Sequence, residues 1–123
     1  MRVYSFEKLK VWVMSRELGA EIYKITSEFP TDEKFGITSQ IRRSALSVPT
    51  NLAEGSARIT GKEKARFTEI AFSSLMETLN HLIIAVNLGF LNLTSFIKML
   101  LVGSVPGLIL MFCWKSNHFI TFC

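Results

Sequence analysis

Apolar residues recur every three or four positions through most of residues 6–90 of this 123-residue chain. That spacing lines them along one side of an α-helix, and such a helix is stable when its apolar side packs on another helix. No stretch of useful length alternates apolar and polar residues as a strand would. The sequence therefore predicts an all-α protein, and 123 residues suffice for one domain with its own core.

The first and third predicted helices have the most regular stripes. The first closes at Pro30, which cannot continue a helix; its stripe consists of Leu9, Trp12, Val13, Leu18, Ile22, Ile25 and Phe29. The third begins at Thr60, where a hydroxyl and the carboxylate of Glu63 have the spacing of a capping box, and it ends at Gly89. Its stripe consists of Phe72, Leu75, Leu79, Leu82 and Val86. This near-heptad spacing favours long antiparallel packing.

The second predicted helix contains a proline in its interior. Its apolar face consists of Ile37, Ile41, Ala45, Val48 and Leu52. Pro49 is expected to kink or break the helix, because its nitrogen cannot donate the bond to Ala45. Gly55 is expected at the C′ position just past the end, because glycine adopts the left-handed conformation at low cost.

Three such helices leave a groove that a fourth, beginning near Thr94, would fill. The expected architecture is an antiparallel up-down four-helix bundle, with residues 1–91 forming helices one to three. Residues 92–123 are expected to form an atypical apolar segment in place of the usual fourth helix. The fourth helix of this bundle is therefore expected to be atypical or disrupted. The residues expected to be buried are Leu18, Ile22, Ile25, Ile41, Val48, Leu75, Leu79 and Leu82.

The segment 92–123 is unusual because its only charged residues are Lys98 and Lys115. Three interpretations remain open: a divergent fourth helix, a membrane segment, or a shifted reading frame at the end of the gene. Residues 99–114 lack charge, but they are fewer than the ~20 residues of a spanning helix and include Pro106. A membrane partner is therefore not expected, and the abrupt change in composition favours a frame change.

Charge and cysteine content limit the partners and the compartment. The formal net charge of +4 is compatible with a polyanionic partner but is modest. Cys113 and Cys123 are too few for a secreted disulfide scaffold and lack C-x-x-C spacing. The N-terminal residues do not resemble a signal peptide, so a cytoplasmic protein is expected.

No set of residues has the spacing of a catalytic or metal site. His81 and His118 are far apart in sequence, and Cys113 lacks the partners of a nucleophilic triad. Residues 55–63 resemble a phosphate-binding loop only superficially, since Glu63 stands in the place of the Ser or Thr. The chain is therefore predicted to be non-enzymatic, with no catalytic residue, metal or cofactor.

The candidate binding residues are basic and lie in the second helix, the following turn and the start of the third helix. They are Arg42, Arg43, Arg58, Lys62, Lys64 and Arg66. The arginine pair would lie about 18–20 Å along the second helix from the turn, at 1.5 Å per residue, a span that can follow a nucleic-acid backbone. Alternatively, Arg43 pairs with Glu54 or with a carboxylate on a neighbouring helix, and the lysines are simply solvated.

Several blocks of the sequence, in order, resemble a family of four-helix-bundle proteins that includes those encoded by intervening sequences of 23S rRNA genes. The family also resembles accessory proteins of diversity-generating retroelements. The blocks are residues 6–12 (FEKLKVW), 29–30 (FP), 34–43 (KFGITSQIRR), 48–55 (VPTNLAEG) and 88–91 (LGFL), with Phe67, Ala71, Ser74 and Glu77 between them. Residues 92–123 depart from the polar, Glu- and Lys-rich fourth helix usual in the family.

The resemblance implies an up-down bundle that self-associates into a homo-oligomer, notably a pentamer. Relatives that act beside reverse transcriptases favour binding to RNA or DNA. Together with the basic residues, this predicts an oligomeric nucleic-acid-binding accessory factor. The alternative is a protein-interaction scaffold that does not bind nucleic acid.

Overall fold

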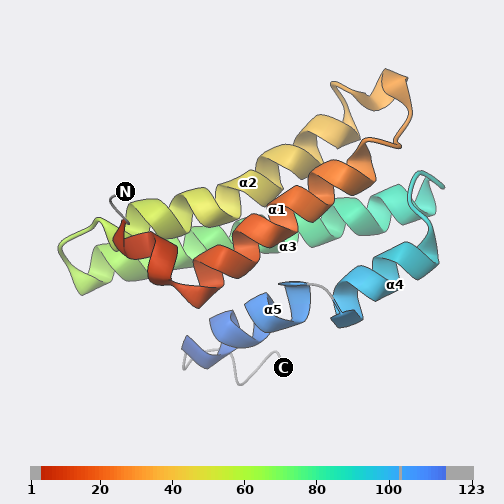
Figure 1. The fold of residues 1–123 in the computed structure, drawn as a ribbon. Coiled ribbons are helices and arrows are strands. Elements are labelled where there is room, and N and C mark those ends of the chain that lie inside the picture. Colours follow the sequence, from red (N-terminus) through yellow and green to blue (C-terminus); the bar gives the residue numbers. More distant parts are fainter. Residues whose placement is uncertain (1–3, 103, 116–123) are drawn as a thin grey trace.

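The computed structural model describes residues 4–102 and 104–115, and within these ranges every regular element is helical. The predicted all-α class is confirmed. Figure 1 shows the long helices side by side, with the shorter C-terminal helices along one side of them. In chain order the elements are η1 (Ser5–Lys8), α1 (Lys10–Thr26), η2 (Thr31–Glu33), α2 (Ile37–Ser56), α3 (Gly61–Asn87), α4 (Leu93–Val102) and α5 (Ser104–Lys115).

The middle long helix, α2, packs against both α1 and α3. The chain reverses direction at each connection, so the end of α2 lies near the start of α1 and the start of α3. The core holds most of the predicted residues: Leu18, Ile22, Ile41, Val48, Leu75 and Leu82 are buried. Ile25 and Leu79 are half-buried and pack against this core from the margins of their stripes.

Small hydroxyl residues line the contact between α2 and α3. Ser44 Oγ lies 2.9 Å from Thr78 Oγ1, and Ser47 Oγ lies 2.9 Å from Ser74 Oγ. Thr78 is fully buried, and its hydroxyl also lies 2.9 Å from the carbonyl of Ser74. These bonds satisfy polar groups that would be costly to bury alone, and they favour one register of the two helices.

Helix α2 continues through Pro49, so of the two expected effects, a kink or a break, the break is wrong. Proline removes one backbone hydrogen bond, but the side chains that follow bond to neighbouring carbonyls. Thr50 Oγ1 donates to the carbonyl of Leu46, and Asn51 Nδ2 donates to that of Ser47, both at 2.8 Å. Val48 and Leu52, which flank the proline, are buried where α2 packs on α1 and α3, and this packing outweighs the local preference of proline.

Gly55 is not a C′ residue, because α2 runs one residue further and its cap is Ala57. Gly55 is buried inside the last turn, and a Cβ built on it would lie 2.8 Å from Cβ of Phe67. The glycine is therefore explained by the close approach of α3.

Gly89, with φ of 74°, does end α3 as predicted. The N–H of Gly89 donates to the carbonyl of Val86, and the N–H of Phe90 donates to the carbonyl of Ala85. These two bonds form the Schellman pattern.

The fourth position of the bundle is taken by two short helices instead of one long one. Helix α4 contacts α3, and α5 packs along α1 (Figure 1). Met99, Val105 and Leu108 are buried in the common core, and a Cβ on Gly107 would collide with Met14. The described residues of the apolar segment thus pack as a divided fourth helix. In the described ranges, no helix has both the length and the apolar character needed to cross a bilayer.

Candidate nucleic-acid interface

Arg42 and Arg43 lie on two different sides of α2. Successive residues of an α-helix are separated by about 100° around its axis, since a turn takes 3.6 residues. Arg42 accordingly faces α1, where its Nε donates to Thr26 Oγ1 at 2.8 Å and its guanidinium lies 4.6 Å from the centre of the Tyr23 ring. Arg43 faces α3. The two arginines do not form one joint binding surface.

Arg43 takes part in an ion pair with a neighbouring helix. Its Nη2 lies 2.9 Å from Glu77 Oε1 and 3.1 Å from Gln40 Oε1. The partner is thus a carboxylate on α3, one of the alternatives that the sequence left open, and it is not Glu54. The pair is exposed, so it adds little to stability. Arg43 can exchange Glu77 for another anion at low cost.

The other four predicted residues gather at the connection between α2 and α3, and we call them the turn cluster. They are Arg58, Lys62, Lys64 and Arg66, and all four are exposed. Two of them share one aromatic ring: the guanidinium carbons of Arg58 and Arg66 lie 4.6 Å and 5.0 Å from the centre of the Phe67 ring. A guanidinium group on a ring can still use its N–H groups to bind an anion, and one of those of Arg66 already faces the Glu63 carboxylate at 3.4 Å.

Phe67 is held in place by the glycine of α2. Its side chain is only 6% exposed, and the missing Cβ of Gly55 lets it approach that helix.

Thr60 caps α3 by accepting a 3.2 Å bond from the N–H of Glu63. The carboxylate of Glu63 lies 3.4 Å from Arg66, which is an exposed pair. The hydroxyl half of the predicted capping box is therefore present.

The turn cluster lies where the C-terminus of α2 meets the N-terminus of α3. The N-terminus of a helix carries a partial positive charge, which stabilises anions and destabilises cations in the first turn. Residues 58–66 hold four basic side chains against the one carboxylate of Glu63. Lys62 and Lys64, in the first turn of α3, are disfavoured by the dipole of that helix, whereas Arg58 follows the C-terminus of α2, which favours cations.

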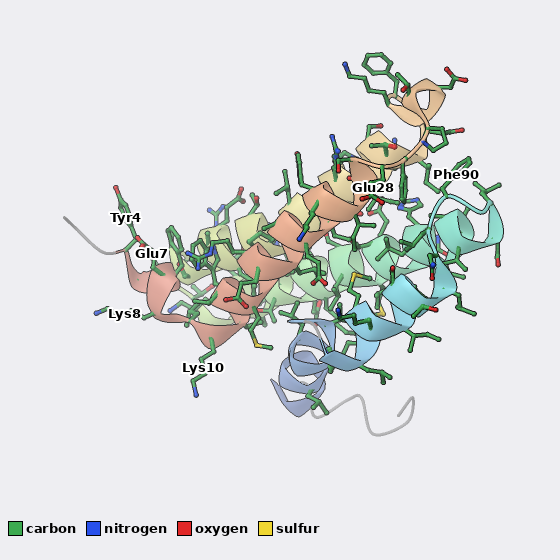
Figure 2. All side chains as sticks on the ribbon, turned by 45° about the vertical axis from the view of Figure 1, so that its right-hand side comes forward. Tyr4, Glu7, Lys8, Lys10, Glu28 and Phe90 are labelled. Carbon is green, nitrogen blue, oxygen red and sulfur yellow. The ribbon has the colours of Figure 1, made fainter. Side chains whose placement is uncertain are left out.

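Two further lysines belong to this end of the molecule, although sequence reasoning did not select them. Lys8 ends η1 and Lys10 begins α1, and Figure 2 shows both side chains pointing outward. They lie at the turn-cluster end because α1 starts where α2 ends (Figure 1). The antiparallel order of the helices places the start of α1 beside the end of α2, and this order could have identified both lysines.

The six predicted residues therefore divide into one cluster and two separate arginines. Ser56, the last residue of α2, lies about 20 Å along the axis from Arg43 at 1.5 Å per residue. The opposite end of the bundle carries Glu28, Asp32 and Glu33 beside Lys34. The positive potential is thus concentrated at one end of the bundle.

The described residues contain no group of three or more His, Cys, Asp or Glu side chains placed to hold a metal ion. His81 is half-buried on α3, and its Nδ1 is buried without a hydrogen-bond partner among the described residues. His118 and Cys123, and the side chain of Cys113, lie outside the described part of the chain.

The fold and its basic end define a small up-down helical-bundle protein. The family model described as 23S rRNA-intervening sequence protein matches residues 7–101, and the chain belongs to that family. The match extends through most of α4 and ends before α5. Among curated proteins, none matches the chain.

Proposed function

We propose that this protein is a non-enzymatic, self-associating bundle that binds the backbone of RNA or DNA in the cytoplasm as an accessory factor. The observation that carries the proposal is the turn cluster. Its four cations lie together at the connection between α2 and α3, and two of them are supported by Phe67. Arg supplies a planar fork suited to phosphate, and Lys adds a mobile point charge.

Binding of this kind would depend little on base sequence. Phosphate contacts position a protein on nucleic acid, whereas base contacts specify the site. The turn cluster provides the principal contacts. Arg42 and Arg43 contribute less, because Arg42 is bonded to α1 and Arg43 is paired with Glu77.

Self-association would strengthen the weak contacts of a single chain. Helix α4 exposes Leu93, Ile97 and Leu101 at intervals of four residues, with exposed fractions of 58%, 44% and 73%. These residues form an apolar stripe opposite the buried Met99, and a second copy of the chain would cover it. A ring of copies, such as a pentamer, would bring several turn clusters together and raise the avidity for one long polyanion.

The same stripe supports a second candidate function, a protein-interaction scaffold without nucleic-acid binding. The two functions differ in what happens when the turn cluster loses its charge. A scaffold would keep its assembly and its partners, whereas a nucleic-acid-binding protein would lose its ligand.

The test is a salt titration of binding to RNA and to duplex DNA. Neutralising all six residues (R42Q, R43Q, R58Q, K62Q, K64Q and R66Q) should weaken binding without loss of helical signal. The R58Q/K62Q/K64Q/R66Q variant should account for most of that effect, and R42Q/R43Q for little. The logarithm of the binding constant should fall linearly with the logarithm of salt concentration, with a slope near −0.9 per phosphate contact on duplex DNA and about −0.7 on single strands.

A flat salt response, or full binding by the six-fold variant, would contradict the proposal. The matched control is a variant that neutralises Lys24 and Lys34 near the other end of the bundle. It removes positive charge but leaves the turn cluster intact, and its binding should be close to that of the unaltered chain.

A further inference from the structure

A chain of aromatic rings lies at the same end of the bundle as the turn cluster. Tyr4 and Phe6 are stacked, with ring centres 5.7 Å apart and planes within 5° of parallel. Phe6 in turn packs on Trp12 at 5.1 Å and a tilt of 57°. The guanidinium of Arg16 lies 5.3 Å from the centre of the Trp12 ring. The rings thus form a continuous ladder from η1 onto α1.

The ladder ends on a ring that is open to solvent. Tyr4 is 61% exposed, whereas Phe6 and Trp12 are half-buried. Two hydrogen bonds to Glu7 hold the backbone of Tyr4 in place. The Tyr4 N–H donates to Glu7 Oε1 at 2.9 Å, and the Tyr4 carbonyl accepts from the Glu7 N–H at 3.1 Å. An ordered aromatic face in water, already stacked on one side, is a platform for another flat ring.

Basic residues lie at the same end of the bundle as this platform. Element η1 contacts α2, and Figure 1 shows it beside the part of α2 that leads into the turn cluster. In Figure 2, Lys8 and Lys10 point outward from the same end of the molecule as Tyr4 and Glu7. Ile59, in the turn itself, is 97% exposed. The end of the bundle thus combines cations for a backbone with apolar surfaces for bases.

We infer that this end of the protein takes single-stranded nucleic acid in preference to duplex, with an unpaired base stacked on Tyr4. The inference rests on the proposed function, because the turn cluster holds the phosphates. In a duplex the faces of the bases are covered by their neighbours, so the ring of Tyr4 finds no partner there. In a single strand, every base offers a face, and binding through stacking tolerates any sequence.

The experiment compares the unaltered full-length chain with the Y4A and Y4W variants on an unstructured single-stranded RNA and on a DNA duplex of equal length. Stacking on one aromatic residue contributes enough that Y4A should lower single-strand affinity by about fivefold to one hundredfold. Duplex affinity should change by less than about twofold, because phosphate contacts remain. Y4W keeps a stacking ring and should retain single-strand affinity.

The matched control is F35A. Phe35 is 87% exposed and has Lys34 over its ring at 5.6 Å, but it lies at the other end of the bundle. Its loss should leave both affinities unchanged, which separates a stacking site from general surface aromaticity. Because Tyr4 and Phe35 are both exposed, neither variant removes core packing, and helical signal should be the same in all of them.

The outcomes separate this inference from the function on which it rests. If single strand and duplex both bind and Y4A weakens neither, or weakens both equally, the stacking site is wrong and the phosphate-binding proposal stands. If neither nucleic acid binds to the unaltered chain, the proposed function fails and the inference fails with it. Loss of single-strand affinity in Y4W as large as in Y4A would also overturn the stacking site.

Discussion

Phe67 links the packing of the bundle to the chemistry of its basic end. One part of the side chain fills the space that Gly55 leaves open on α2, and the ring supports the guanidinium groups of Arg58 and Arg66. Both arginines are exposed, so their attraction to the ring is modest. Its main effect is to hold two planar groups at one place, which lowers the conformational entropy that anion binding would otherwise cost.

Replacing Gly55 by alanine should therefore disturb both stability and the turn cluster. The added methyl group would meet Phe67 at 2.8 Å, so the side chain or α3 must shift. Overpacking of this kind costs about 1–3 kcal/mol, which thermal or urea unfolding monitored by circular dichroism would measure.

Gly61 provides the control for that substitution. It lies in the first turn of α3, and a Cβ built there would have no atom within 4 Å. G61A should be neutral or slightly stabilising, because alanine reduces the freedom of the unfolded chain without a clash. Equal stability of G55A and G61A would show that the close approach of the two helices is not needed.

At the scale of the elements, periodicity predicted most of what is observed. The spacing of Leu18, Ile22, Leu75 and Leu82 places them in the core because helix period and burial are coupled. Predictions from single residues, such as proline and glycine, were wrong where the packing of the helices opposed them. Pro49 lies within a continuous helix because contacts on both sides of it hold the turn, and Gly55 serves packing instead of ending the helix.

The candidate site was predictable only in part for a similar reason. Closeness in sequence correctly grouped residues 58–66, which share one turn. It also grouped Arg42 with Arg43, although adjacent helical residues point to different neighbours. Lys8, Lys10 and Tyr4 join the same end only through the antiparallel order of the helices, which no local pattern of residues contains.

Helices α4 and α5 can be tested by ending the chain after Leu91. The truncated protein would lose the buried side chains Met99, Val105 and Leu108, each of which contributes about 1.5–3 kcal/mol when fully buried. Helices α1 to α3 should still form, because α2 packs against both others. The uncovered face should make the protein associate, so we expect helical circular dichroism with a lower melting temperature and a larger size by gel filtration.

The full-length chain is the reference for that measurement. Loss of all helical signal on truncation would show that three helices are insufficient. Solubility of the full-length chain only in detergent, relieved by the same truncation, would support a membrane anchor instead of a packed fourth helix.

At the scale of the whole molecule, the turn cluster and the apolar stripe of α4 lie in different regions. The turn cluster lies where α2 meets α3, whereas Leu93, Ile97 and Leu101 follow the outer side of α4. The exposed stripe can therefore be covered in an assembly while the basic ends remain free. This separation is compatible with the proposed combination of self-association and polyanion binding.

Substituting the exposed stripe should consequently dissociate the assembly without unfolding the chain. Light scattering after gel filtration should give a mass of about five times the 13.9 kDa of one chain if the closed ring is a pentamer. The L93S/I97S/L101S variant should run as a monomer with unchanged helical signal. Its affinity for a long RNA should fall more than its affinity for a short one, because only the long RNA spans several turn clusters. The control substitutes three exposed apolar residues outside α4, Phe35, Leu46 and Ile59, and should keep the full mass. A monomeric unaltered chain, or an assembly that survives the stripe substitutions, would contradict this arrangement.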